Sequence, residues 1–177
     1  MSDERIRVVG AVGLVIGALF GMAGTFAPSP ELRGLAWGVD GVALVVAFAL
    51  ISVHHFRHGR DQLAAGFLVF LAAETLIVAG SAMDLEEVAP LFAAGASLWA
   101  AALGLISSAP AVPMFLRVTG AIGAVLFAIT GLRLFGGAGL TPLTTPLPFY
   151  AYPFLAMTLI GWAWVLTRRQ PERVGSA

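Results

Sequence analysis

The sequence predicts an all-α integral membrane protein: a bundle of six transmembrane helices that forms one domain over residues 1–177. Hydrophobic residues make up 59% of the 177 residues and charged residues only 11%, whereas soluble domains carry roughly 25% charged residues. Six apolar stretches are each long enough to cross a hydrocarbon layer of about 30 Å. The segments between them are too short for a separate soluble domain. The predicted spans are residues 8–26, 34–53, 63–82, 91–106, 115–135 and 149–166.

The first span follows a short polar tail. A cleaved signal peptide is the alternative for this segment, because Thr25-Phe26-Ala27 resembles a small-residue cleavage site. Pro28 follows this tripeptide directly, and the apolar run is long for a signal sequence. We therefore expect the segment to remain as a transmembrane helix.

Four connecting segments differ in character. Residues 27–33 form a proline-broken turn, and residues 54–62 form a compact basic loop. Residues 83–90 predict an acidic turn that ends at Pro90. Residues 136–148 form an uncharged loop rich in glycine and proline. Proline fixes the backbone dihedral φ, so we expect this last segment to follow an extended course.

The distribution of arginine predicts the orientation. With both termini in the cytoplasm, only Arg33 and Arg133 fall on the outer side, and the positive-inside rule favours that arrangement. We expect a multi-pass protein of a bacterial-type inner (plasma) membrane with both termini cytoplasmic. The arginines then on the cytoplasmic side are Arg5, Arg7, Arg57, Arg60, Arg117, Arg168, Arg169 and Arg173.

An internal similarity relates the first and fifth spans. The segment from Arg7 to Gly21 matches the segment that starts at Arg117, at a fixed offset of 110 residues. This similarity suggests three helical hairpins, with hairpins one and three related as parallel repeats. Membrane composition inflates matches of glycine, alanine and valine, so chance similarity is the alternative.

Small residues mark a face of the first span. Gly13, Gly17 and Gly21 are spaced four residues apart, and small residues let helix backbones approach closely in a membrane. Packing within the chain is the favoured interpretation. Contact with a second copy, giving a homo-oligomer, or with another membrane protein is the alternative.

Three ionisable residues are the candidates for binding a solute or a proton: Asp40, Glu74 and Arg133. Glu74 lies near the middle of the third span, where an isolated carboxylate is unfavourable unless it is protonated, paired or next to water. We expect an outward-facing pocket in which Glu74 binds and Asp40 or Arg133 tunes the site. A structural role for each of the three residues is the alternative.

His54 and His58 are weak candidates for a metal site, because an i, i+4 pair shares one helix face. No carboxylate lies between them, and Arg57 and Arg60 would repel a cation. We favour a basic turn that binds no metal.

Composition excludes several functions. The chain has no cysteine and no lysine, so thiolate chemistry, disulfides and lysine Schiff bases are excluded. A sustained basic face for nucleic acid is missing. No nucleophile–base or phosphate-binding motif is present, so we expect neither an enzyme nor a cofactor.

The sequence therefore predicts a small multi-pass protein in the lipid bilayer that binds or translocates a small solute or proton through a pocket around Glu74. An accessory or scaffold protein that acts through helix–helix contacts is the alternative.

Overall fold

The computed structural model describes residues 1–80, 83–141, 143–144 and 147–168, except for the side chain of Pro148. Within these residues six α-helices are long and apolar enough to cross a membrane, which confirms the predicted helical membrane bundle. A short π-helical turn, η1, precedes the last helix. The elements are α1 (Asp3–Thr25), α2 (Pro30–Arg57), α3 (Asp61–Gly80), α4 (Leu85–Ser108), α5 (Met114–Phe135), η1 (Leu147–Ala151) and α6 (Tyr152–Thr167).

The first two helices begin about one turn before the predicted spans. The side chain of Ser2 accepts a hydrogen bond from the backbone N–H of Arg5, and that of Ser29 accepts one from Leu32. Pro30 occupies the first helical position of α2, where its missing N–H is not needed. These caps extend each helix beyond its apolar part.

The expected acidic turn over residues 83–90 is wrong, because α4 is already helical from Leu85 and contains Pro90. Packing explains the early start: the side chains of Val88 and Leu91 lie against Gly80 at the end of α3. Burying Val88 favours helix over turn. The expected loop over residues 136–148 also ends early, at the π-helical turn that begins with Leu147.

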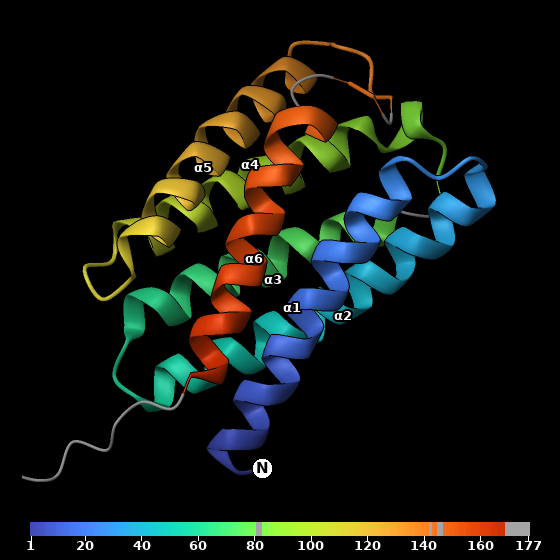
Figure 1. The fold of residues 1–177 in the computed structure, drawn as a ribbon. Coiled ribbons are helices and arrows are strands. Elements are labelled where there is room, and N and C mark those ends of the chain that lie inside the picture. The colour runs from blue at the N-terminus through green and yellow to red at the C-terminus, as the bar shows by residue number, and fades with distance from the viewer. Residues whose placement is uncertain (81–82, 142, 145–146, 169–177) are drawn as a thin grey trace, which may run out of the picture.

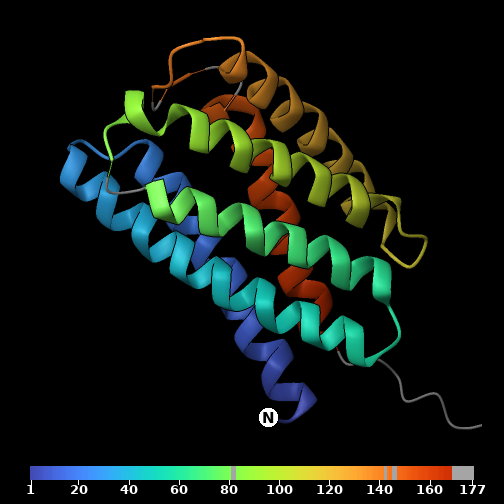
Figure 2. The ribbon, with the colours of Figure 1, turned by 180° about the vertical axis from the view of Figure 1, so that it is seen from behind.

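The six helices form a ring in chain order. Each helix contacts the next along the chain, and α6 packs against both α5 and α1, which closes the ring. Figures 1 and 2 show this arrangement from opposite sides, with α1 and α5 running in the same direction. Their shared direction is what a parallel repeat requires, and the repeat itself stays a prediction.

Aromatic side chains fill the middle of the bundle. Phe48 of α2 stacks on Phe70 of α3 with ring centroids 4.6 Å apart, and Phe67 lies 6.1 Å from Phe48. All three side chains are almost fully buried. We call Phe48, Phe67 and Phe70 the aromatic plug.

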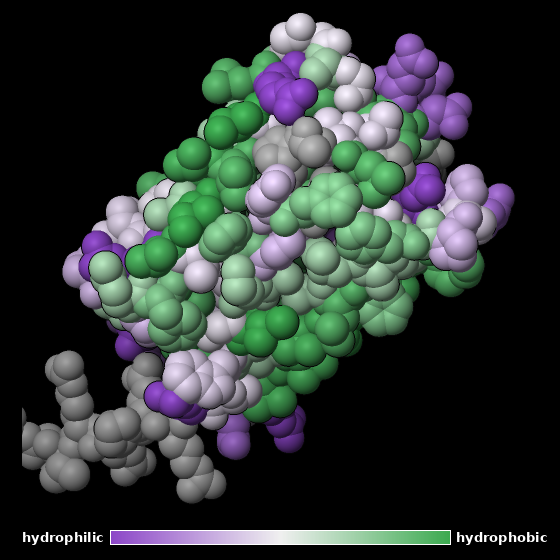
Figure 3. All heavy atoms as spheres, turned by 45° about the horizontal axis from the view of Figure 1, so that its top comes forward, coloured by the Kyte–Doolittle hydropathy of each residue, from purple (hydrophilic) through white to green (hydrophobic). Residues whose placement is uncertain are grey.

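The surface has the pattern of a membrane protein. Apolar residues cover the side of the bundle in Figure 3, and hydrophilic residues gather towards its two ends. Many large apolar side chains on the helices are exposed, among them Leu19, Val42, Val125 and Leu132. A bilayer would cover such a surface.

The glycine face of α1 packs within the chain. A Cβ atom at Gly13 would lie 2.8 Å from the backbone oxygen of Ala43 in α2, and one at Gly21 would lie 2.8 Å from Oδ2 of Asp40. Gly17 faces Leu44 and Asp40, which are also in α2. Helix α2 therefore occupies the face formed by Gly13, Gly17 and Gly21.

Three parts of the sequence predictions lie outside the described residues. These are the end of the third span, at residues 81–82, residues 142 and 145–146 of the predicted loop, and the basic tail with Arg169 and Arg173.

Candidate functional site

A cavity of about 90 Å³ lies in the half of the bundle away from the N-terminus. It is lined from α1, α2, α3, α4 and α6 and from the connecting segments near Met83, Leu140 and Leu147. This volume holds several water molecules or a small solute. We call it the carboxyl cavity, because Asp40 lines it and Glu74 lies beside it.

Asp40 is in the second third of α2 and lines the carboxyl cavity. Its carboxyl group lies against Gly17 and Gly21 of α1, where a side chain would leave no room for it. The buried oxygen Oδ1 has no hydrogen-bond partner. A buried polar atom without a partner is unusual in proteins and indicates a place where a ligand or water can bind.

Glu74 of α3 is only 1% exposed. Its Oε2 accepts a hydrogen bond from the indole Nε1–H of Trp99 in α4, at 3.2 Å. Its Oε1 lies close to Gly41, which follows Asp40 in α2. Asp40 and Glu74 are near enough to interact electrostatically. The structure thus brings together two of the three residues that the sequence singled out.

Aromatic rings form part of the cavity wall. Trp37, Trp99 and Tyr152 line it, and the rings of Trp99 and Tyr152 are 6.4 Å apart. The indole of Trp37 donates a hydrogen bond to the backbone oxygen of Gly21 at 3.4 Å, which holds this ring against α1. The faces of such rings attract cations.

The charge in the carboxyl cavity is of one sign. Among the described residues that line it, Asp40 is the only ionisable group apart from the phenol of Tyr152, and none is basic. Arg133 is exposed in the last turn of α5 and is not among the lining residues. A role for Arg133 in tuning the site stays a prediction.

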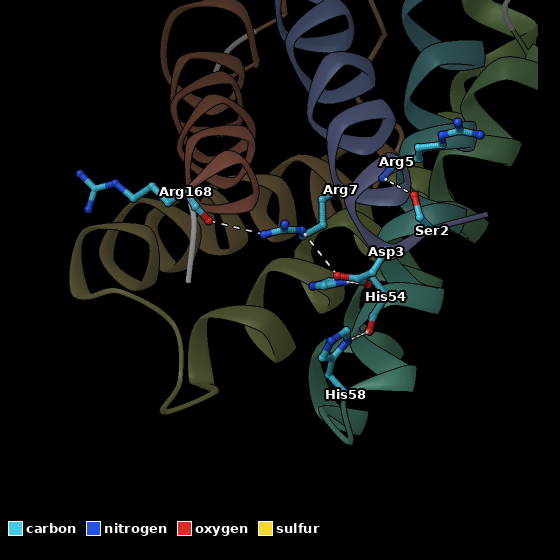
Figure 4. A network of polar contacts seen from close by, with 7 residues as sticks. All are labelled: Ser2, Asp3, Arg5, Arg7, His54, His58 and Arg168. Atoms are coloured by element: carbon cyan, nitrogen blue, oxygen red, sulfur yellow. Dashed lines mark hydrogen bonds and ion pairs between the residues drawn. The ribbon is translucent and has the colours of Figure 1, made fainter. Parts of the chain in front are cut away.

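A second group of polar residues lies at the N-terminal end of the bundle (Figure 4). Asp3 of α1 contacts His54 of α2, with 2.7 Å between Oδ1 and Nδ1. Arg7 lies 3.6 Å from the same carboxylate. His58 makes a 2.7 Å hydrogen bond from Nδ1 to the backbone oxygen of His54. These contacts connect the start of α1 to the end of α2.

The weak metal candidates His54 and His58 gain a carboxylate here. Asp3, His54 and His58 can each offer one ligand atom, and these atoms lie within 4.8 Å of one another. The hydrogen bonds just described already use Nδ1 of both histidines. A basic turn that binds no metal stays the prediction.

Sequence reasoning missed Trp99 and Asp3. Trp99 had a usable signal, because an indole N–H in the middle of an apolar span needs an acceptor, and Glu74 is the acidic residue of the neighbouring span. Asp3 gave no such signal within a short polar tail. Tyr152 of α6 also lines the cavity.

No protein-family model matches this chain, and neither a curated protein nor a solved structure shows significant similarity to it.

Proposed function

We propose that the protein binds a small organic cation with an apolar body in the carboxyl cavity. The observation that carries this proposal is the carboxyl group of Asp40, which lines a largely apolar cavity with its Oδ1 atom unpartnered. An ammonium group donates hydrogen bonds to a carboxylate, and such charge-assisted bonds are the strong ones.

The remaining wall suits the rest of such a ligand. Trp37 and Tyr152 present aromatic rings, which attract a cation over their faces. Leu44, Leu155 and Leu159 offer apolar surface for an alkyl chain. An anion would meet carboxyl groups with no basic partner among the described lining residues, so the cavity selects against it.

Glu74 supplies a second acidic group, which can hold a proton beside Asp40. Two carboxylate charges near each other in an apolar wall repel, and water is scarce there to stabilise them. We propose that the pair Asp40 and Glu74 shares a proton when the cavity is empty. An arriving ammonium group then takes the place of that proton.

Passage of the bound solute across the membrane is the finer proposal. Along α2 and α3, the aromatic plug lies between the carboxyl cavity and the N-terminal end of the bundle. A solute therefore passes only if helices move and open another route. Many transporters alternate access to a central site in this way. We further propose an inner-membrane location with both termini cytoplasmic, which places the carboxyl cavity towards the outer side.

An accessory role through the glycine face of α1 has less support. Gly13 and Gly17 are buried against α2, so a partner would have to use a different surface. We also propose no catalytic role for the carboxyl cavity, since its described lining offers carboxyl, indole and phenol groups and the hydroxyl of Thr141, with no histidine or lysine as a base.

Tryptophan fluorescence tests the proposal, because Trp37 and Trp99 line the cavity. Purified protein in maltoside micelles is titrated with propylammonium and tetraethylammonium, with propanol as the neutral control. We expect saturable quenching by the cations only. Asp40→Asn removes the charge-assisted hydrogen bond that propylammonium donates, so the affinity for propylammonium should fall about tenfold or more. Glu74→Gln should weaken the pH dependence of binding.

Glu87→Gln is the matched control, since Glu87 is an exposed carboxylate at the same end of the bundle. Its affinity should equal that of the wild type. The proposal fails if neither cation gives saturable quenching, or if Asp40→Asn and Glu87→Gln bind like the wild type.

A further inference from the structure

A second cavity, of about 140 Å³, lies at the N-terminal end of the bundle. Its lining comes from α1, α2, α3 and α6, from the turn between α2 and α3, and from the segment before α5. Four basic side chains take part in that lining, and we call the space the basic cavity. They are Arg7, His54, His55 and Arg60.

His55 is the most telling of these residues. Its side chain is only 2% exposed, and neither ring nitrogen has a hydrogen-bond partner. The ring stacks on Phe67 with centroids 5.5 Å apart and lies 5.8 Å from Trp162. Packing thus holds the ring in place at the cavity wall, while its polar atoms are left for something else to bind.

Arginine provides permanent positive charge at the same wall. Arg60 is close enough to His54 and His55 to interact with both electrostatically. The guanidinium of Arg7 is held by Asp3, whose Oδ2 lies 3.6 Å from Nε, and by a 3.5 Å hydrogen bond from Nη1 to the backbone oxygen of Arg168. Guanidinium groups match the geometry of phosphate oxygens.

The balance of charge in the basic cavity favours an anion. None of the described residues that line it is acidic. The nearby carboxylate of Asp3 neutralises part of the charge through His54 and Arg7, and Arg60 remains in excess. Arg117, in the first turn of α5, lies at the same end of the bundle and raises the local concentration of anions.

We propose that the basic cavity binds a phosphate group, with Arg60, Arg7 and a ring N–H of His55 as its partners. The phosphate comes either from a phospholipid headgroup or from a soluble phosphate. The site lies where the helices end, at the level where a bilayer changes from hydrocarbon to headgroups, so both sources reach it.

Thermal unfolding in phosphate-free maltoside micelles tests this proposal and separates the two sources. One arm adds inorganic phosphate at constant ionic strength against chloride. The other arm adds phosphatidic acid, with diacylglycerol as the matched lipid without phosphate. A rise in the unfolding temperature with inorganic phosphate indicates a soluble ligand. A rise only with phosphatidic acid, and none with diacylglycerol, indicates a headgroup.

Two variants test the residues, and one serves as control. Arg60→Gln and His55→Phe should each lower the apparent affinity for the stabilising phosphate compound about tenfold or more. Phe keeps the stacking of His55 on Phe67 and Trp162. Arg57→Gln removes the same charge from an exposed position outside the cavity, and its affinity should match that of the wild type.

Three results would overturn the proposal. Neither inorganic phosphate nor phosphatidic acid stabilises the wild type; Arg60→Gln is stabilised as strongly as the wild type; or Arg57→Gln loses the effect as fully as Arg60→Gln. If His55→Phe does not fold, the comparison of Arg60→Gln with Arg57→Gln still decides the matter.

Discussion

The two cavities of this bundle have opposite chemistry. The carboxyl cavity presents Asp40 in a largely apolar wall and has no basic residue in its described lining, whereas the basic cavity presents Arg7 and Arg60 with two histidines and has no acidic one. The acidic residue of the first cavity, Asp40, comes from within an apolar span. The basic residues of the second cavity come from positions near the ends of helices. The comparison shows that one small bundle can hold an acidic and a basic cavity with packed side chains between them.

The aromatic plug provides that separation. Along α2, Leu44 lines the carboxyl cavity and His55 lines the basic cavity, and Phe48 lies between them. The same order holds on α3, where Phe67 and Phe70 lie between Leu63 and Ile77. The plug therefore occupies the space between the cavities.

Removing the plug should have the largest effect. Phe48 is fully buried, so Phe48→Ala should lower the free energy of unfolding by about 3–5 kcal/mol. It should also disturb ligand binding in both cavities. Unfolding in mixed micelles with a denaturing detergent measures the loss. Phe56→Ala, on the same helix and 70% exposed, is the control. Equal losses in the two variants would show that Phe48 does not separate the cavities.

Filling the glycine face should affect one cavity only. Gly17→Leu places a side chain against Leu44 and Asp40. Overpacking of this kind destabilises proteins by about 1–3 kcal/mol. Cation binding should weaken, while the effect of phosphate on the unfolding temperature should be retained. Gly38→Leu is the control, because nothing lies within 4 Å of a Cβ atom at Gly38. A matching loss of phosphate binding in Gly17→Leu would contradict the independence of the cavities.

The smallest effect should come from Asp3→Asn. This change weakens the contact with His54 and should lower the free energy of unfolding by about 1 kcal/mol or less, since Asp3 is part-exposed. It also removes a negative charge beside the basic cavity, so the affinity for phosphate should rise. Glu4→Gln, at the exposed neighbouring residue, should change neither quantity. Weaker phosphate binding in Asp3→Asn would contradict the anion site.

Much of the fold could be predicted from the sequence, because membrane spans are set by local composition. The apolar runs gave six helices with small errors at their ends. Those errors arose where polar residues continue a helix past the hydrocarbon, as at Ser2 and Ser29, or where packing favours a helix, as at Val88.

The candidate site was only partly predictable. Glu74 is conspicuous in an apolar span, yet its approach to Asp40 depends on the rotation of α2 and α3 about their axes. Gly41 permits that approach, and no local pattern reveals it. Arg133, like Asp40, is an ionisable residue in a predicted apolar span. It lies at the end of α5, however, where it is exposed and is not among the residues that line the cavity. The basic cavity depends on α1 and α6 meeting α2, which is a long-range property of the chain.

The aromatic plug also has an electrostatic consequence. Asp40 and His55 are 15 residues apart on α2, which corresponds to about 22 Å along the helix. Across packed rings that exclude water and ions, a bound cation and a bound phosphate would attract each other by about 0.8 kcal/mol at an effective dielectric constant of about 20. That energy corresponds to about a fourfold change in binding affinity. Because such coupling is reciprocal, each ligand would strengthen the binding of the other by the same factor.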